Sequence, residues 1–257
     1  MDAILTAGGI PQPGEPLYEF TQGKYKAMLD IGGKSMIQWV LDAVCGSEAV
    51  ENVILSGLPA NANVNCQKIR AYIPDQGNML DNILVGMRKV QEINPASHHV
   101  LIVSSDIPTI TTDMVDWVVQ TTMRTDEDAY YHVITRQTME ARFPGSNRTY
   151  TKFKGIEVCG GDMNVIRTTL SGNEAFWSKV IAARKSPLKQ AALLGYDTLF
   201  LLLFRLIDLE GAVKKVTQRV HLTGRAIICP YAEIGMDIDK PHQLELVRAD
   251  FSKRIPG

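Results

Sequence analysis

The stretch Ala3-Ile4-Leu5-Thr6-Ala7-Gly8-Gly9 opens the chain with a mostly apolar run that ends abruptly in two glycines. This pattern predicts a buried first strand followed by a glycine-rich loop. Two glycines at the carboxyl end of a strand let backbone N–H groups face a bound anion, because no Cβ stands in the way. A turn-rich segment, residues 10–22, leads to Gly23-Lys24-Tyr25-Lys26. A lysine returned to the loop would add a mobile positive charge, so the arrangement suits a nucleoside triphosphate.

The composition is that of a soluble globular chain. Of the 257 residues, 45% are hydrophobic and 21% are charged, which is sufficient for a sizeable core. The formal net charge of −1 creates no overall field that would attract nucleic acid or a membrane. The five histidines have no metal-ligand spacing, and the four cysteines form no CxxC pair. We expect free thiols in a reducing compartment, not disulfides, at Cys45, Cys66, Cys159 and Cys229.

The hydropathy of the chain points to the cytoplasm. The first residues carry neither the basic region nor the cleavage site of a signal peptide. The most apolar run, residues 198–204, is closed by Arg205 and is far shorter than the roughly 20 residues that a membrane-spanning helix needs. We therefore expect no membrane insertion, and we interpret this run as a buried helix.

The first half of the chain alternates between strand and helix patterns. This order predicts an α/β fold with a mostly parallel sheet, helices on both faces and ligands at the carboxyl ends of the strands. Both Gly8-Gly9 and Asp106 fall at such ends. Beyond the first strand, we expect strands at 52–56, 68–73 and 99–104, and helices at 36–44, 79–91 and 112–119.

The second half is less regular. We expect one domain over residues 1–257, in which residues 140–222 form a helical insertion. The elements predicted in this half of the chain are a strand at 129–135, a surface loop at 140–151, strands within 150–159 and 164–166, helices at 176–183, 186–194, 198–204 (capped by Asp197) and 209–219, a strand at 225–229, and a last helix from Pro241.

Two distant acids and the early lysine could form one catalytic site. Nucleotidyl transfer requires a held triphosphate, an open α-phosphorus, a neutralised pyrophosphate and a shared metal. Mg²⁺ prefers oxygen ligands and usually takes one or two carboxylates. Asp106 and Asp239 each end a predicted strand that a parallel sheet would place near the first loop. They could hold Mg²⁺ together, with Lys26 contacting the α-phosphate or the leaving group.

Each of these residues also has a plain structural explanation. Glycines are common in strand-to-helix turns, and an isolated lysine is often only solvated. Asp106 precedes Ile-Pro and could form a turn, while Asp239 could cap the helix that begins at Pro241. The order of the four elements along the chain is the one that a single site would require, and this favours the functional interpretation.

Four segments of the sequence form a recognisable set: Leu5-Thr6-Ala7-Gly8-Gly9, Lys26-Ala27-Met28-Leu29-x-Ile31-x-Gly33-Lys34-x-Met36-Ile37, Ser105-Asp106-Ile107-Pro108 and Asp237-Ile238-Asp239-Lys240-Pro241. They resemble the MobA-like nucleotidyltransferases of the glycosyltransferase-A-type superfamily. The resemblance covers residues 2–44, 98–120 and 225–248, and its first stretch is the most specific. It implies a Rossmann-like, three-layer α/β/α fold with a mostly parallel mixed sheet. It also implies Mg²⁺-dependent transfer of NMP from an NTP, CTP or GTP being favoured, onto a phosphorylated small-molecule acceptor with release of pyrophosphate.

The resemblance also implies roles for individual residues. Asp106 and Asp239 match the metal-binding positions, and Lys26 matches the loop lysine, so these three are the predicted catalytic residues. The segment Asp75 to Asn82 falls where relatives recognise base and ribose, and Gly161 and Asn164 fall where sugar-nucleotide enzymes contact ribose or acceptor. The predicted nucleotide-binding residues are Ala7, Gly8, Gly9, Lys24, Lys26, Gly77, Asn78 and Asn82.

The sequence departs from the family pattern in the first loop. Many relatives carry an arginine there, whereas the longer loop Ile10–Leu17 has none, so Lys24 is the candidate substitute. The acceptor side is the region 140–222. Within it, Lys185 and Lys189 flank a predicted helix start and could seat a phosphate, although a solvated helix junction explains them equally well.

Three other classes of function can be weighed against the same residues. A glycosyltransferase with a nucleotide-sugar donor typically carries a D-x-D motif, and Ser104-Ser105-Asp106 offers only one acid. A non-catalytic nucleotide-binding protein of the same fold is favoured slightly by the arginine-free loop. Nucleic-acid binding is disfavoured because the chain is near neutral and has no basic aromatic stripe. The oligomeric state, a homodimer included, is left open.

Overall fold

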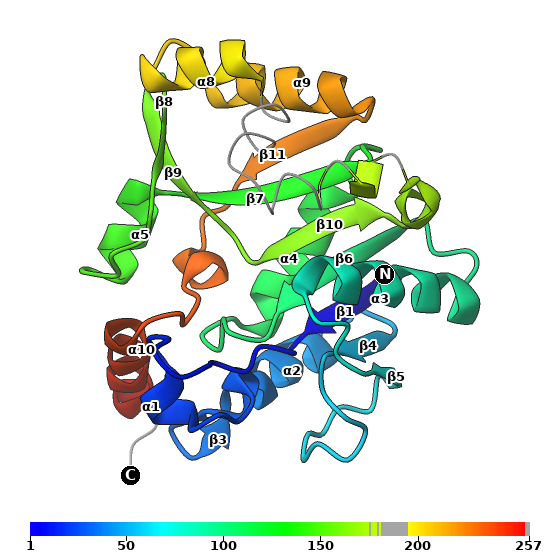
Figure 1. Ribbon diagram of the computed structural model, residues 1–257, viewed down its shortest axis with the longest axis vertical. Helices are drawn as coiled ribbons and strands as arrows, with labels where there is room; N and C mark the ends of the chain where they lie inside the picture. Colours follow the sequence, from blue (N-terminus) through cyan, green and yellow to red (C-terminus); the bar gives the residue numbers. More distant parts are fainter. Residues whose placement is uncertain (175, 179, 181–194, 255–257) are drawn as a thin grey trace.

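The computed structural model describes residues 1–174, 176–178, 180 and 195–254. At its centre lies a nine-stranded mixed sheet, whose four neighbouring strands β5, β4, β1 and β6 run parallel (Figure 1). The predicted α/β class with a mixed central sheet is confirmed. The spatial order is β5 (Ile69–Ile73), β4 (Val53–Ser56), β1 (Asp2–Thr6), β6 (His99–Ser104), β10 (Met163–Arg167), β7 (Ala129–Thr135), β9 (Ile156–Gly160) and β8 (Thr151–Phe153), with β11 (Gly224–Ile228) parallel to β7.

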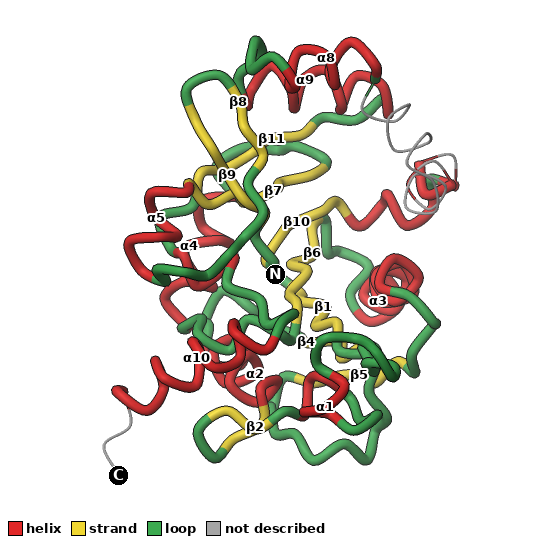
Figure 2. Tube along the Cα trace, turned by 60° about the vertical axis from the view of Figure 1, so that its left-hand side comes forward, coloured by secondary structure: helices red, strands yellow, loops and turns green. Residues whose placement is uncertain are grey.

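The first strand is covered on both faces, which explains its unbroken apolar sequence. Ala3 and Leu5 pack into a cluster with α2 (Met36–Gly46) and α4 (Thr112–Thr122), whereas Ile4 faces α3 (Met79–Ile93). Figure 2 shows α3 on one side of the sheet and α2 and α4 on the other.

The register of the parallel strands places three loops at one level. Thr6, the last residue of β1, lies opposite Ser56 at the end of β4 and opposite Ser104 at the end of β6. The chain therefore leaves all three strands at the same edge of the sheet. This edge carries the glycine loop and Asp106, as the parallel topology predicts.

Short elements complete this edge. The loop after β1 contains α1 (Tyr18–Thr21) and the 3₁₀ helix η1 (Lys26–Met28), and the hairpin β2 (Asp30–Ile31) and β3 (Lys34–Ser35) follows. The last helix, α10 (Pro241–Arg254), begins two residues after Asp239 and packs near β2. The remaining short helices are η2 (Thr168–Gly172) and η3 (Ala232–Gly235).

Two details of the expected secondary structure are corrected. The loop expected at 140–151 overlaps a helix, α5 (Arg136–Arg142), whose N-cap is Thr135: its hydroxyl accepts from the Thr138 N–H at 3.0 Å. The sequence signal for the start of this helix is Thr135 at the N-cap and Thr138 at the third helical residue. Such a capping pattern is a weaker signal than hydrophobic periodicity. Asp197 does not cap α8 (Tyr196–Leu203); Gly195 does, and Asp197 binds Lys215 of α9 (Leu209–Val220) at 2.8 Å.

The expectation of a buried helix at 198–204 is also corrected. Thr198 is buried, but Phe200 is 58% and Leu203 76% exposed among the described residues. The helix lies with α9 at one end of the molecule and packs against β8, an edge strand (Figure 1). Apolar composition alone cannot distinguish a central helix from one at such an edge.

The cysteines, the hydropathy of the helices and the domain division were also the subject of expectations. All four cysteines are free, and no helix of the described residues is long and apolar enough to cross a membrane. The division into one domain with an insertion at 140–222 stays a prediction. The helix expected at 186–194 and most of the one expected at 176–183 lie outside the described residues.

Candidate active site

The glycine loop rests on the loop that follows β4. The Ala7 N–H donates to the Ser56 carbonyl at 2.8 Å. Gly57 has a φ of +104°, and a Cβ there would collide with the backbone N of Gly8, so only glycine fits. A Cβ on Gly8 would in turn stand 2.6 Å from Oδ1 of Asp75. The backbone of the loop is therefore held close to both neighbouring loops.

The two predicted metal-binding acids are joined through the backbone. Asp106 follows β6, and its carbonyl accepts from the Ile238 N–H at 3.0 Å. This bond places Asp239 beside it. The Ser104 hydroxyl donates to Oδ1 of Asp106 at 2.5 Å, and Gln243 of α10 accepts from the Asp239 N–H at 2.9 Å. The Asp106 carboxylate and the backbone of Asp239 are thus held by groups other than Lys26.

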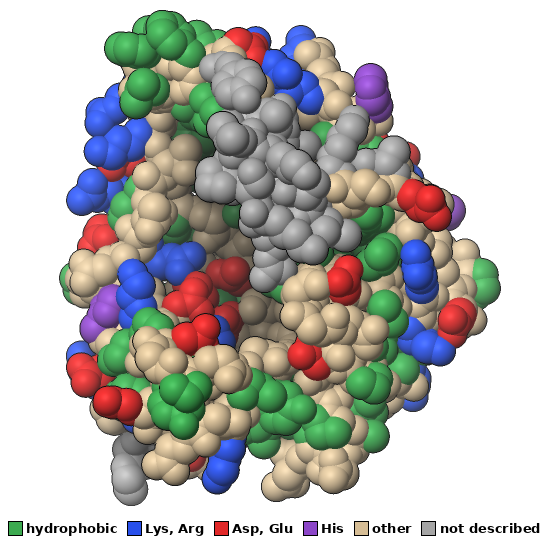
Figure 3. All heavy atoms as spheres, viewed as in Figure 1, with side chains coloured by type: hydrophobic (Ala, Val, Ile, Leu, Met, Phe, Trp, Pro, Cys, Tyr) green, Lys and Arg blue, Asp and Glu red, His purple; other side chains and the backbone are tan. Residues whose placement is uncertain are grey.

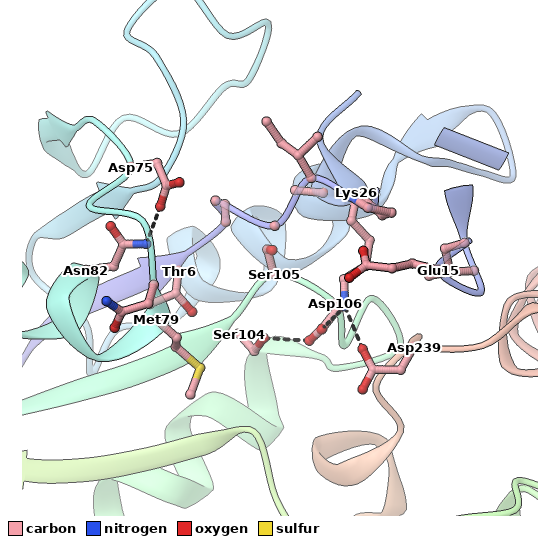
Figure 4. Close-up of a pocket in the computed structure, with 18 of the residues that line it drawn as sticks. Thr6, Glu15, Lys26, Asp75, Met79, Asn82, Ser104, Ser105, Asp106 and Asp239 are labelled. Atoms are coloured by element: carbon pink, nitrogen blue, oxygen red, sulfur yellow. Dashed lines mark hydrogen bonds and ion pairs between the residues drawn. The ribbon is translucent and has the colours of Figure 1, made fainter. Parts of the chain in front are cut away.

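Lys26 lies between the two carboxylates (Figure 4). Its Nζ is 2.6 Å from Oδ2 of Asp106 and 2.7 Å from Oδ1 of Asp239, while its backbone N–H donates to the Gly9 carbonyl at 2.8 Å. Burial alone would lower the pKa of Lys26, but the charges of Asp106 and Asp239 outweigh it and raise the pKa above its ordinary value. The lysine is therefore charged at neutral pH.

The carboxylates fit a magnesium ion. Because one oxygen of Asp106 and one of Asp239 contact the same ammonium, they converge on a point where a single cation is already stabilised. Two carboxylates is the number that Mg²⁺ usually takes from a protein, with water and phosphate completing its octahedron. Among the described residues, no group of three or more His, Cys, Asp or Glu is arranged to hold a metal. Two carboxylates that leave most of the octahedron open suit a metal shared with a substrate phosphate.

These groups line one end of a cavity of about 740 Å³, a volume typical of small-molecule sites. Figure 3 shows acidic and basic side chains gathered in this hollow. The cavity is lined by Thr6, Ala7, Gly8, Gly9, Ile10, Pro11, Gln12, Glu15, Pro16, Leu17, Lys26, Ala27, Asp75, Gly77, Asn78, Met79, Asn82, Ser104, Ser105, Asp106 and Asp239.

The opposite end of the cavity is built by the turn before α3. Asn82 donates from Nδ2 to Oδ1 of Asp75 at 2.8 Å and accepts at Oδ1 from the Gln76 N–H at 2.8 Å. Asn78 caps α3 by accepting from the Asp81 N–H at 3.1 Å. The turn is thereby held in one shape, with its Asp75 and Asn82 side chains directed at the cavity (Figure 4).

Not every predicted site residue lies at this cavity. Seven of the eight predicted nucleotide-binding residues line it, but the exposed Lys24 does not. Gly161 and Asn164 do not line it either. The Asn164 amide accepts from the His132 N–H at 2.9 Å and donates to the Gly161 carbonyl at 2.8 Å. Lys185 and Lys189 lie outside the described residues.

Two acidic residues at the site escape the sequence patterns. Glu15 reaches the cavity from the long first loop. Asp162 precedes β10, and its carbonyl accepts from the Ser104 N–H at 3.0 Å because β10 pairs antiparallel with β6. Burial, and then the charge of Asp106, raise the pKa of Asp162 to about 7. The Gly160-Gly161 pair predicts a turn before Asp162, but it does not indicate that this turn lies beside β6.

The comparisons with known proteins define the class. The model of the MobA-like NTP transferase domain matches residues 20–199. Because this is well over half of the chain, the protein belongs to the MobA-like NTP transferase family. The resemblance inferred from the motifs is thereby confirmed, and nucleotidyl transfer is supported at this general level. No curated protein matches the sequence.

Solved structures support the same fold. A hypothetical transferase from Thermus thermophilus has 26% identity and a TM-score of 0.80 and covers 95% of this chain and 98% of its own. The CMP:2-keto-3-deoxy-manno-octonic acid synthetase, in complex with CTP, has 16% identity and a TM-score of 0.59 with 99% of both chains covered. The 4-diphosphocytidyl-2C-methyl-D-erythritol synthase from Anaerococcus prevotii DSM 20548 has 13% identity and a TM-score of 0.57 with 97% of both chains covered. The last two show the fold alone.

Proposed function

We propose that the protein is a Mg²⁺-dependent nucleotidyltransferase that moves NMP from an NTP onto a phosphorylated small-molecule acceptor and releases pyrophosphate. The observation that carries this proposal is the convergence of Lys26, Asp106 and Asp239 beside the Gly8-Gly9 loop. Membership of the MobA-like family supports it. CTP and GTP are the favoured donors, and the CTP complex of a protein with this fold makes CTP the first to test.

The cavity suggests how a nucleotide would lie. The backbone N–H groups of Gly8 and Gly9 would face the phosphates, since neither residue has a Cβ to obstruct them. The turn with Asp75 and Asn82, at the other end of the cavity, would border the base and ribose. Asp106 and Asp239 would hold Mg²⁺, which when bound supplies positive charge to the phosphate oxygens.

The reaction would be an in-line displacement. An oxygen of the acceptor phosphate attacks the α-phosphorus, the bond from this phosphorus to the α–β bridging oxygen breaks, and its electron pair leaves with pyrophosphate. Lys26 would neutralise charge that develops on the α-phosphate or the leaving group. A phosphate acceptor is already an anion at neutral pH, so no residue has to remove a proton from it.

The test combines binding and turnover. The purified protein is titrated calorimetrically with each of the four NTPs and Mg²⁺, and pyrophosphate release is followed with a panel of sugar and polyol phosphates. We expect one NTP to bind and one acceptor to release pyrophosphate, with activity lost in Asp106→Asn. Binding without any turnover would favour a non-catalytic nucleotide-binding protein, and free NDP released from a nucleotide sugar would favour a glycosyltransferase. No binding of any NTP would contradict the proposal.

A further inference from the structure

We infer that Lys26 is a built-in counter-cation. Its ammonium lies between Asp106 and Asp239, where a divalent cation would bind. When nucleotide and metal bind, the ammonium moves to the triphosphate and the metal takes its position between the two acids. The inference rests on the proposed function for the identity of the incoming groups. It adds that metal loading is coupled to nucleotide binding through one lysine.

The contact geometry makes the two cations exclusive. The ammonium of Lys26 contacts one oxygen of each carboxylate, at 2.6 and 2.7 Å. A magnesium or manganese ion would need the same oxygens at about 2.1 Å. Two cations that share both oxygens would lie only about 4 Å apart, where like charges repel strongly in a partly desolvated site. The lysine must therefore leave before a metal can bind both acids.

The Asp106 carboxylate and the backbone of Asp239 are held independently of the Lys26 side chain. Asp106 keeps the Ser104 hydroxyl at 2.5 Å on its other oxygen, and the backbone around Asp239 is fixed by Ile238 and Gln243. The Lys26 side chain contacts no other acid among the hydrogen bonds and ion pairs of the described residues. Four rotatable bonds let its ammonium move while the backbone stays in place.

The new partner of the lysine lies within its reach. The Lys26 backbone N–H is bonded to the carbonyl of Gly9 at 2.8 Å, so the side chain pivots beside the loop that would carry the phosphates. A triphosphate on this loop offers the ammonium several anionic oxygens. A divalent cation alone offers it none, and would leave a partly buried charge without a partner, which is costly.

Thermodynamic linkage follows from this difference. Metal alone has to displace Lys26 at a cost, whereas nucleotide removes Lys26 from the carboxylates and frees them for metal. Each ligand therefore increases the affinity of the other, and the coupling is reciprocal. If Lys26 is replaced by an uncharged residue, Asp106 and Asp239 face each other without compensation, and a divalent cation becomes their best partner.

The experiment measures Mn²⁺ binding by electron paramagnetic resonance of the free ion at pH 8, with the full chain and no nucleotide. We expect Lys26→Met to bind Mn²⁺ about tenfold more tightly than wild type. Lys26→Arg keeps the charge, and Lys24→Met removes an exposed lysine that does not line the cavity, so both should match wild type. The double variant Lys26→Met with Asp106→Asn should lose the gain, which would locate the ion at the two acids.

A second arm measures the coupling itself. The affinity for a CTP analogue with a methylene group between the α- and β-phosphates is measured in EDTA and in saturating Mn²⁺. The metal-dependent gain in affinity should be at least fivefold smaller in Lys26→Met than in wild type. Lys26→Gln serves in both arms if Lys26→Met does not fold, as judged by its thermal unfolding.

The inference is overturned if Lys26→Met or Lys26→Gln binds Mn²⁺ no more tightly than wild type, or if Lys26→Arg gains as much as Lys26→Met. It is also overturned if the coupling to the analogue is unchanged. Failure of the proposed function looks different, because it would be an absence of pyrophosphate release from wild type while the Mn²⁺ titrations still separate the variants.

Discussion

Gly57 lies so close to Gly8 that a side chain at position 57 would collide with the backbone nitrogen of position 8. Gly57 is also held at a φ of +104°, where residues with a Cβ are strained. The loop after β4 thus packs directly against the backbone of the loop after β1. The shape of the candidate phosphate-binding loop depends on a residue that does not itself line the cavity.

Gly57→Ala should therefore damage both stability and nucleotide binding. We expect a loss of about 3 kcal/mol in the free energy of unfolding, because backbone strain and steric overlap add, together with at least tenfold weaker NTP binding. Gly9→Ala is the matched control, since nothing lies within 4 Å of its Cβ position. Urea unfolding should show Gly9→Ala near wild type. Equal stability of the two variants would contradict the claim that the positive φ of Gly57 and its close approach to Gly8 require glycine at position 57.

Asp106→Asn should abolish most activity without unfolding the protein. Asparagine keeps the shape of the side chain and can still accept from the Ser104 hydroxyl, but it removes the charge proposed to bind Mg²⁺. We expect pyrophosphate release to fall by about 10²–10³-fold, the typical effect of removing one electrostatic group from an active site, and EDTA to remove the activity of wild type. Asp113→Asn, at an exposed position of α4, is the control. Activity of Asp106→Asn within a few-fold of wild type would exclude the metal-binding role.

The part of the site that depends on parallel-strand topology alone could be predicted from the sequence. Parallel strands send their carboxyl ends to one edge, so Gly8 and Asp106 could be placed together from the alternating pattern alone. The resemblance to a family then brought in Asp239, which no local pattern places near Asp106. The Ile238–Asp106 backbone bond that joins them spans more than 130 positions, and periodicity carries no information at that range.

Other parts could not be predicted for related reasons. Asp162 lies near Asp106 because β10 enters the sheet antiparallel beside β6, whereas the sequence predicted a strand at 164–166 without indicating its neighbours. The exposure of Phe200 and Leu203 depends on where α8 lies in the finished fold, and an apolar sequence does not encode that. Lys24 is polar and close to Lys26 in sequence, yet η1 brings only Lys26 to the acids.

His132 should make the protein sensitive to acid. It is fully buried in β7, and burial lowers its pKa to about 4. In the unfolded chain a histidine titrates near 6.5, so the unfolded state takes up the proton first as the pH falls. Stability should therefore be complete above pH 6.5 and fall between pH 6.5 and 4, by about 2 kcal/mol at pH 5 from this residue.

Urea unfolding at pH 8 and pH 5 measures this effect. His132→Leu has no group to titrate and should lose about 2 kcal/mol less than wild type between the two pH values. His98→Leu removes an exposed histidine and should retain the wild-type loss. If His132→Leu and wild type lose the same stability on acidification, the acid sensitivity has another source.

Arg142 should be the main polar tie between α5 and α10. Its Nη1 and Nη2 each donate to one oxygen of Asp250 at 2.9 Å, and its Nε donates to Oε1 of Glu233 at 2.7 Å. The two acids, Asp250 and Glu233, are 16% and 10% exposed, so removal of the guanidinium deprives two mostly buried carboxylates of this counter-charge. Such residual charges account for most of the cost when one partner of a buried pair is deleted.

Arg142→Ala should lower the free energy of unfolding by about 2 kcal/mol, less than for a fully buried pair because Arg142 itself is 33% exposed. Arg136→Ala, in the same helix, is the matched control: its pair with Glu157 is more exposed, and little change is expected. Because α10 begins only two residues after Asp239, Arg142→Ala should also weaken NTP binding, whereas Arg136→Ala should not. Equal unfolding curves for the two variants would show that α10 is held by its apolar contacts alone.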